Sequence, residues 1–313
     1  MSTAAVIGAS SPVGGAISRR LTSVGHEVVL VGDDVARHEQ KRLLEGATVV
    51  VHAGDPSRTA DVLDASSAVS ADHVVILSTA AVYGAWPDNP VPLTEDAVLR
   101  PNPGVDAVAA RAETERVAAE WRGEHPATLL TVLRPCPVVI AGGEDWPAPG
   151  LEGVAGMGSG DDTRAVQFLH VDDLASAVVA VIEAKLDGAV NVAPNGWITE
   201  GEARALSGGR VVPLPEPVRS VARRIGIGRR RDATAALQKH AWVVANDRLC
   251  TTGWEPVYSH AEALVATRRP TWWQRLSPTK RQELSLAVAG GGALAVVGGL
   301  AFAVLRRRAR NRD

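Results

Sequence analysis

The chain has few of the residue types that most often carry catalysis or metal binding. Its 313 residues include two cysteines, two tyrosines and four lysines. Cys136 and Cys250 lie far apart without the spacing of metal ligands, so we expect free thiols in a reducing compartment and no metal site. The formal net charge of −2 argues against a nucleic-acid partner. The N-terminus has no charged start followed by an apolar run and a cleavage site, so we expect no signal peptide.

The start of the chain carries the most informative pattern. A short apolar run leads into Gly8 and Gly14, and a helical pattern follows. In a parallel α/β protein the first glycine allows a sharp turn after the strand, and the later one allows the helix to pack closely. The amides at the helix N-terminus are then free to bind the oxygens of a pyrophosphate. We therefore predict a dinucleotide site, although Ser11 stands where the usual spacing has a middle glycine.

Acidic residues follow the second predicted strand, which covers 28–31. Asp33 and Asp34 come about 20 residues after the glycines, where a carboxylate would bind the adenosine ribose. No arginine lies between positions 32 and 36 to accept a 2′-phosphate, which favours NAD over NADP. Gly32 occupies the position where the acid is first expected.

The rest of the chain alternates between predicted strands and helices, which favours a parallel sheet. The expected strands cover 48–52, 72–77, 128–133, 166–171 and 189–192, and the expected helices cover 35–44, 103–122 and 172–185. Only the helical segment at 35–44 separates Asp34 from Ala47, so the first half of the sheet is predicted to be shortened. The Gly- and Pro-rich stretches at 141–163 and 193–217 are predicted to lie outside the sheet in a small lobe.

A long uncharged segment lies near the C-terminus. Residues 284–305 contain no charge, and at about 1.5 Å per residue they are long enough for the roughly 30 Å apolar core of a bilayer. We predict a single transmembrane helix in the cell membrane, with the main domain in the cytoplasm. Basic residues on both flanks leave the orientation open. Small residues at every fourth position from Ala287 to Ala303 would permit a homodimer, or are a coincidence in an Ala/Gly-rich segment.

Several short motifs carry a family resemblance. In chain order they are Gly8-x-x-Ser11-x-x-Gly14, His52-Ala53-Gly54, Ser78-Thr79-Ala80-Ala81-Val82-Tyr83-Gly84, Leu133-Arg134-Pro135, Phe168-Leu169-His170-Val171-Asp172-Asp173-Leu174 and Gly253-Trp254-Glu255-Pro256. With this order and spacing, the chain from residue 4 to about 266 resembles the extended short-chain dehydrogenase/reductase family, in its NAD-dependent epimerase/dehydratase branch.

The resemblance implies a doubly wound, Rossmann-like parallel sheet that binds NAD(P) and a smaller C-terminal lobe that holds a nucleotide-activated sugar. In such enzymes a Tyr removes a hydroxyl proton while the nicotinamide takes a hydride, and a nearby Lys lowers the pKa of the Tyr. A Ser or Thr hydrogen-bonds the reacting oxygen. Thr79 matches this last position, with capping of local backbone as the alternative.

The resemblance also implies the division of the chain. It assigns 1–195 to the NAD(P)-binding domain, with an insertion at about 141–163, and 196–266 to the substrate lobe. A juxtamembrane linker at 267–283, the transmembrane helix at 284–305 and a basic tail at 306–313 complete the predicted organisation. The expected cofactor-binding residues are Gly8, Ser10, Ser11, Pro12, Val13, Gly14, Asp33, Ala53, Gly54, Ser78, Arg111, Pro135 and Val138.

The Tyr–Lys pair of the family is missing. The residues four positions after Tyr83 and Tyr258 are Pro87 and Glu262, and no lysine lies between Lys41 and Lys185. One register of the family's helix places Ala107 and Arg111 at the Tyr and Lys positions. The other register, anchored on Glu113, places Val105 and Ala109 there. Arg111 could still hold the ribose, but a guanidinium cannot activate a phenol that is absent.

Two functions therefore remain open from the sequence. One is a non-catalytic or strongly altered NAD-binding protein tethered to the membrane. The other is an active NAD-dependent nucleotide-sugar epimerase, dehydratase or reductase that uses Thr79 and a different proton acceptor. Tyr83, Arg223 and Arg224 are candidate substrate contacts. The basic cluster at 219–231 binds a nucleotide diphosphate, faces solvent or meets an anionic lipid surface, and Asp172 and Asp173 are predicted to be structural.

Overall fold

The core of the protein is a six-stranded parallel sheet in the order β10-β5-β4-β3-β1-β2. The computed structural model describes residues 2–140, 145–146, 162–206 and 235–266, all within the unit Met1–Arg268. The strands of this sheet are β1 (Thr3–Ile7), β2 (Glu27–Val31), β3 (Val49–His52), β4 (His73–Leu77), β5 (Leu129–Pro135) and β10 (Gly188–Val192).

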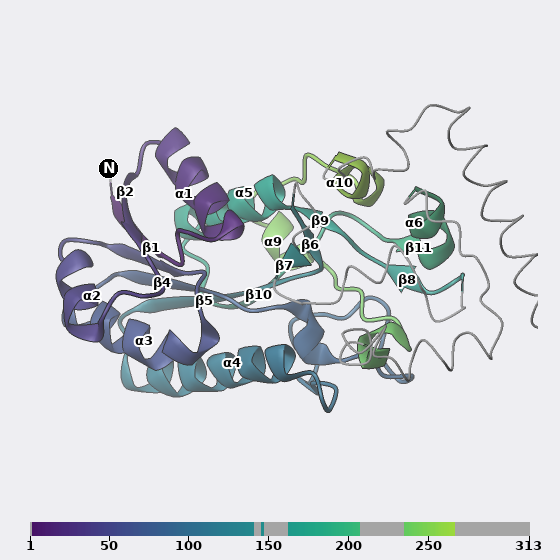
Figure 1. Cartoon of the computed structure of the whole chain (residues 1–313), viewed down its shortest axis with the longest axis horizontal. Helices are drawn as coiled ribbons and strands as arrows, with labels where there is room; N and C mark the ends of the chain where they lie inside the picture. Colours follow the sequence, from purple (N-terminus) through teal and green to yellow (C-terminus); the bar gives the residue numbers. More distant parts are fainter. Residues whose placement is uncertain (1, 141–144, 147–161, 207–234, 267–313) are drawn as a thin grey trace, which may run out of the picture. The chain divides into compact units, whose positions relative to one another are not determined.

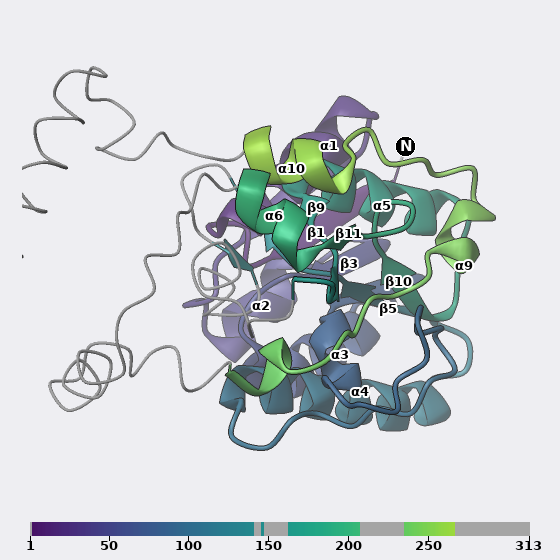
Figure 2. The same ribbon diagram turned by 90° about the vertical axis from the view of Figure 1, so that its right-hand side faces the viewer.

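Helices cover both faces of the sheet (Figures 1 and 2). One face carries α1 (Pro12–Ser23) and α5 (Val171–Glu183), and the other carries α2 (Arg37–Leu43), α3 (Thr59–Ala68) and α4 (Asp106–Glu124). Alternate residues of β1 serve the two layers: Ala4 and Val6 belong to the first apolar core, and Ala5 and Ile7 to the second. Burial on both faces is typical of a parallel sheet, and the predicted doubly wound architecture is confirmed.

The first half of the sheet is short, as predicted. β2 is an edge strand of the described sheet, because β3 pairs with the other side of β1 and no strand lies beyond β2. The chain therefore turns to opposite sides of β1 after its first two crossovers. This makes a topological switch point between β1 and β3, and in open α/β sheets ligands bind at the carboxyl ends of the strands at such a point.

The prediction of one strand over 166–171 is wrong. The structure has two short strands, β8 (Ala165–Val166) and β9 (Leu169–His170), and α5 already begins at Val171. The interruption has a physical cause, because the side chain of Gln167 hydrogen-bonds the backbone of Gly196 and Val244. The amide of Phe168 meets Nδ1 of His260. β8 pairs with Ile198–Thr199 and β9 pairs with Val138–Val139, so the two strands belong to different sheets.

A small lobe is built from short segments that precede and follow β10 in the sequence. β6 (Val138–Val139) pairs with β7 (Asp145–Trp146) and β9, and β11 (Ile198–Thr199) pairs with β8. The helices α6 (Glu200–Leu206) and α10 (His260–Ala266) accompany them, and α9 (Asp247–Cys250) lies beside β10. A separate apolar cluster joins the lobe: Val166, Phe168, Ala203, Ala263 and Leu264.

Several predicted features lie outside the described residues. They are the transmembrane segment 284–305 with its linker and tail, most of the insertion at 141–163, and the basic cluster at 219–231 with Arg223 and Arg224. Among the helices that the structure does describe, none has the length and apolar character needed to cross a membrane.

Candidate functional site

The predicted cofactor residues gather at the carboxyl ends of β1, β3, β4 and β5. Gly8 follows β1, Ala53 and Gly54 follow β3, and Ser78 follows β4. Pro135 ends β5, and Val138 lies in the adjacent β6, where it is buried. The structure therefore places these residues together at the carboxyl ends of the strands, at the switch point.

Two glycines are required here by close backbone approach. Gly8 has a φ of +83°, and a Cβ added to it would lie 2.6 Å from the Cα and N of Gly54. A Cβ added to Gly14 would lie 2.1 Å from the carbonyl oxygen of Gly8. Both neighbours are backbone atoms that cannot rotate away. The turn after β1 and the close packing of α1 thus have the geometric causes expected from the sequence.

Ser11 changes what the helix N-terminus can offer to an anion. Its side-chain oxygen accepts a hydrogen bond from the Gly14 amide at 3.0 Å and donates one to the Gly8 carbonyl at 2.8 Å. Pro12, the first residue of α1, has no amide hydrogen. Of the first-turn positions 12–14, one therefore lacks a donor and another has its donor bound by the cap. The helix amides are less available than the glycine pattern alone predicts.

A stability test follows from this cap. Ser11→Ala should lower the free energy of unfolding by about 1 kcal/mol, because it removes the acceptor of the Gly14 amide, whereas Ser11→Gly should cost only a few tenths of a kcal/mol, roughly the usual difference between these residues at a helix N-cap. Urea unfolding of the two variants measures both values. A loss close to zero for Ser11→Ala would show that the hydroxyl does not cap α1.

The two acids after β2 have different places. Asp33 Oδ1 accepts a hydrogen bond from the Asp55 amide at 3.1 Å and lies over Gly54. A Cβ added to Gly32 would lie 2.6 Å from Asp34 Oδ1, so the carboxylate of Asp34 covers Gly32. The Asp34 carboxylate therefore lies where the side chain of an acidic residue at position 32 would lie. The sequence offered both acids for the ribose, with Asp33 in the predicted cofactor set, and the structure places Asp33 at Gly54 and Asp34 at Gly32.

Arg111 projects from α4 to the ends of two strands. Its guanidinium donates to the carbonyl of Leu77 at 2.7 Å and to that of Gly54 at 3.2 Å. The side chain is buried, and burial lowers the pKa of Arg111 to about 10. Ala107 lies one turn earlier on the same helix face. At the positions that the first register matches to Tyr and Lys, the chain has a methyl group and a cation bound to backbone carbonyls.

Thr79 lies at the carboxyl end of β4 and is buried. Its side-chain oxygen accepts a hydrogen bond from the Ala81 amide at 3.2 Å and caps the short 3₁₀ turn Ala80–Tyr83. Thr79 therefore makes the backbone-capping contact that the sequence analysis gave as the alternative to a role in the reaction.

Tyr83 lies in the core rather than on an open surface. It is 0% exposed, and its hydroxyl donates to Asn191 Oδ1 at 2.9 Å and accepts from Arg134 at 2.7 Å. Burial raises the pKa of Tyr83, although Arg134 opposes this. The side chain proposed from the sequence as a substrate contact is thus held inside a polar network.

Glu115 completes this network, which sequence reasoning missed. Arg134 donates to its carboxylate through Nε and through the terminal nitrogen at 2.7 Å, and Ser78 donates its hydroxyl to the same carboxylate. Both members of the ion pair are buried. The only signal in the sequence is that Glu115 lies four residues after Arg111 on a predicted helix, which cannot identify Arg134 as its partner.

His52 is a further buried titratable group near the carboxyl ends of these strands. Its Nε2 lies 3.3 Å from the Thr59 hydroxyl, and burial lowers the pKa of His52 to about 3, with the nearby Arg111 acting in the same direction. The imidazole is therefore neutral at physiological pH.

Part of the chain is similar in sequence to known proteins. Residues 56–193 match the model of the NAD dependent epimerase/dehydratase family, which confirms the resemblance. The protein y4nG of Sinorhizobium fredii is 29% identical over 167 residues, and this match covers 49% of the present chain and 40% of y4nG. The present chain thus spans less than half the length of that curated relative.

Solved structures share the fold. The UDP-glucose 4-epimerase of Thermus thermophilus, a complex with NAD, has a TM-score of 0.64 at 19% identity, covering 85% of this chain and 97% of its own. The UDP-glucose 4-epimerase of Thermotoga maritima, with UDP-glucose, has a TM-score of 0.66 at 15% identity, with the same two coverages.

Proposed function

We propose, from the match of residues 56–193 to the NAD dependent epimerase/dehydratase family model, that this chain binds NAD at the switch point without the family's Tyr–Lys proton transfer. One observation carries the second half of this proposal. The guanidinium of Arg111 is bound to the carbonyls of Leu77 and Gly54, with Ala107 one turn before it. No phenol is present at that helix position for a cation to activate.

Binding of a dinucleotide is supported by the backbone at Gly8, Gly14 and Gly54. At these positions neighbouring protein atoms approach so closely that no Cβ fits, which is the tight strand–turn–helix geometry of glycine-rich dinucleotide-binding turns. The fold is shared with an epimerase solved in complex with NAD. Asp34 over Gly32, together with the absence of arginine at positions 32–36, favours the free ribose hydroxyls of NAD over the phosphate of NADP.

Two buried groups near the site are poor replacements for the missing base. His52 has a pKa of about 3, because burial disfavours its protonated form, and it therefore takes up a proton only weakly at neutral pH. The carboxylate oxygens of Glu115 are occupied by Arg134 and Ser78. A non-catalytic or strongly altered NAD-binding protein is therefore favoured over an active enzyme.

The proposal extends to a ligand and a location. A nucleotide sugar is the expected small molecule, because the fold is that of an epimerase solved with UDP-glucose. The uncharged segment 284–305 is the proposed membrane anchor. We place the main domain on the cytoplasmic side, and a homodimer through the small-residue face of the segment is part of the same proposal.

Turnover measurements test the loss of chemistry. The full chain, purified in detergent and loaded with NAD, is mixed with a panel of nucleotide sugars, and reduction of the nicotinamide is followed by absorbance. We expect NAD to bind and to stay oxidised with every sugar. Reduction by any of them would show that another group takes up the proton and would favour the active enzyme.

A gain-of-function variant tests whether the rest of the pocket is intact. Restoring the pair as Ala107→Tyr with Arg111→Lys supplies the phenol and a cation on one helix face. A positioned general base contributes about 10²- to 10⁴-fold in rate, so the double variant should reduce the nicotinamide measurably where the unmodified chain does not. Arg111→Lys alone is the matched control and should give no increase.

A further inference from the structure

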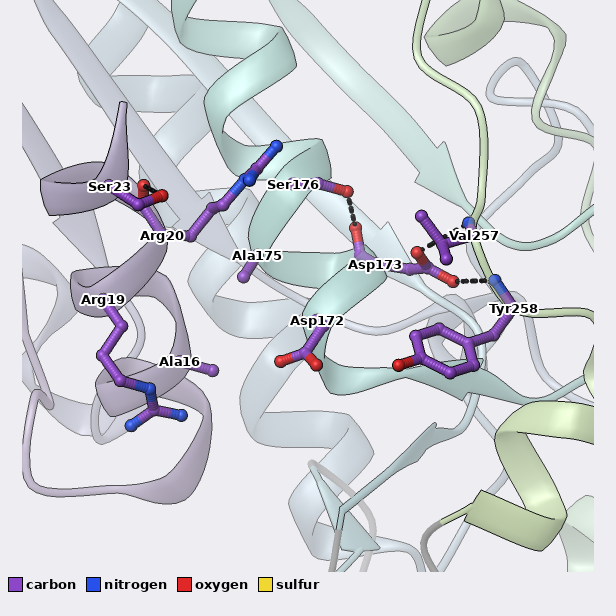
Figure 3. A pocket seen from close by; sticks show the side chains of 10 residues that line it. All are labelled: Ala16, Arg19, Arg20, Ser23, Asp172, Asp173, Ala175, Ser176, Val257 and Tyr258. Atoms are coloured by element: carbon purple, nitrogen blue, oxygen red, sulfur yellow. Dashed lines mark hydrogen bonds between the residues drawn. The ribbon is translucent and has the colours of Figure 1, made fainter. Parts of the chain in front are cut away.

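A groove lies between α1 and α5 (Figure 3), on the side of the sheet opposite to α4 (Figure 1). It has a volume of about 420 Å³, within the range of small-molecule sites. Its walls come from α1, from the first two turns of α5 and from the segment at Val257 and Tyr258. None of its lining residues belongs to the predicted cofactor set, so the groove is separate from the dinucleotide site.

The α1 wall of the groove is cationic. Arg19 and Arg20 are both exposed, and Ser23 adds a hydroxyl. Figure 3 shows Arg20 extending from α1 toward Ser176 of α5. Within the described part of the chain neither guanidinium has a carboxylate partner in an ion pair. Guanidinium groups present several N–H donors in a planar arrangement that suits the oxygens of a phosphate.

The opposite wall offers acceptors, hydroxyls and an aromatic ring. The Asp172 side chain is 62% exposed, and its Oδ2 lies 3.6 Å from His170 Nδ1, the nitrogen that accepts a hydrogen bond from the Asp172 amide. In Figure 3 the hydroxyl of Tyr258 lies on the side of Asp172. A carboxylate accepts hydrogen bonds from hydroxyl groups, and an aromatic side chain offers an apolar face.

This wall is held in place by internal contacts. The two carboxylate oxygens of Asp173 accept from the amides of Val257 and Tyr258 at 2.9 and 3.0 Å. The Tyr258 ring stacks on His170 with a centroid separation of 3.9 Å. The Trp254 indole donates to Ser176 at 2.9 Å. The segment that closes the groove is thus fixed to α5 before any ligand arrives, which lowers the cost of binding.

We propose that this groove binds a sugar phosphate, with the phosphate at Arg20, which extends toward α5 in Figure 3, and the sugar hydroxyls at Asp172 and Tyr258. The cationic wall takes the charged end of the ligand, and the carboxylate opposite takes hydroxyl donors that a bare anion does not have. This inference does not depend on the proposed function at the switch point, because it uses different residues on the outer face of α1 and α5.

Calorimetric titration of the NAD-saturated full chain with glucose 6-phosphate tests the groove. We expect one binding site whose affinity falls about tenfold or more in Arg20→Glu, since a hydrogen bond to a charged group is lost. Asp172→Asn should weaken the same binding. Arg42→Glu, which makes the same charge change on exposed α2, is the matched control and should leave the affinity unchanged.

Two further titrations separate the sugar from the anion. Inorganic phosphate should bind more weakly than glucose 6-phosphate and should be insensitive to Asp172→Asn. Equal affinities for the two would overturn the sugar part of the proposal. Failure of glucose 6-phosphate to bind, or an affinity that Arg20→Glu leaves unchanged, would overturn the site as a whole, whatever the outcome of NAD binding.

Discussion

Gly14→Ala is expected to abolish NAD binding and to destabilise the fold. The added Cβ would lie 2.1 Å from the Gly8 carbonyl oxygen and 2.9 Å from the Cα of Ala9, and both are backbone atoms. Overpacking of this kind typically costs about 1–3 kcal/mol even where the surroundings adjust. Here the adjustment must displace α1 or the turn after β1, which is the surface that would receive the pyrophosphate.

The neighbouring glycine supplies the matched control. A Cβ at Gly15 would meet only Arg19 NH1 at 3.5 Å and the Ala9 carbonyl at 3.7 Å, which are ordinary contacts. Gly15→Ala should therefore stabilise the protein by roughly 0.5–1 kcal/mol, the usual gain of Ala over Gly inside a helix. Urea unfolding and NAD titration of both variants measure the contrast. Equal behaviour of the two would contradict the packing of α1 on Gly8.

Loss of Glu115 is expected to have the largest effect on stability. Glu115→Gln leaves Arg134 buried without its carboxylate, and it also weakens the bond from Ser78. Breaking one side of a buried ion pair costs about 3–5 kcal/mol. Thermal and urea unfolding measure the loss, and the exposed Glu113→Gln on the same helix is the control, which should change the stability little.

Replacement of both partners distinguishes an ion pair from mere packing. Arg134→Met combined with Glu115→Leu removes both charges, so no unpaired charge remains in the core. Such double replacements are often neutral or stabilising, although here Tyr83 loses its contact with Arg134. The double variant should be more stable than Glu115→Gln alone. The opposite order would show that the network contributes more than the pair.

The sequence was sufficient for the backbone framework of the site. The alternation of strands and helices, the glycines at the first turn and the missing strand beyond β2 all follow from residue order and spacing, and the structure confirms them. These features depend on local backbone geometry and on the period of apolar residues. Both can be read from the order of residues along the chain.

The partners of the polar side chains could not be predicted. Helix spacing places Arg111 one turn after Ala107, but the strand ends that its guanidinium reaches depend on how α4 lies across β3 and β4. Tyr83 matched a family motif, yet burial against Arg134 and Asn191 turned it into the core. Such contacts join distant segments, so spacing does not encode them.

The central claim is that the chain keeps a dinucleotide pocket and has lost the base that would use it. The most direct test of the pocket is calorimetric titration of the full chain with NAD and with NADP. The Gly14→Ala variant is titrated under the same conditions. We predict one NAD site, weaker binding of NADP, and no NAD binding to Gly14→Ala. Absence of NAD binding to the unmodified chain, or binding that Gly14→Ala leaves intact, would contradict the account.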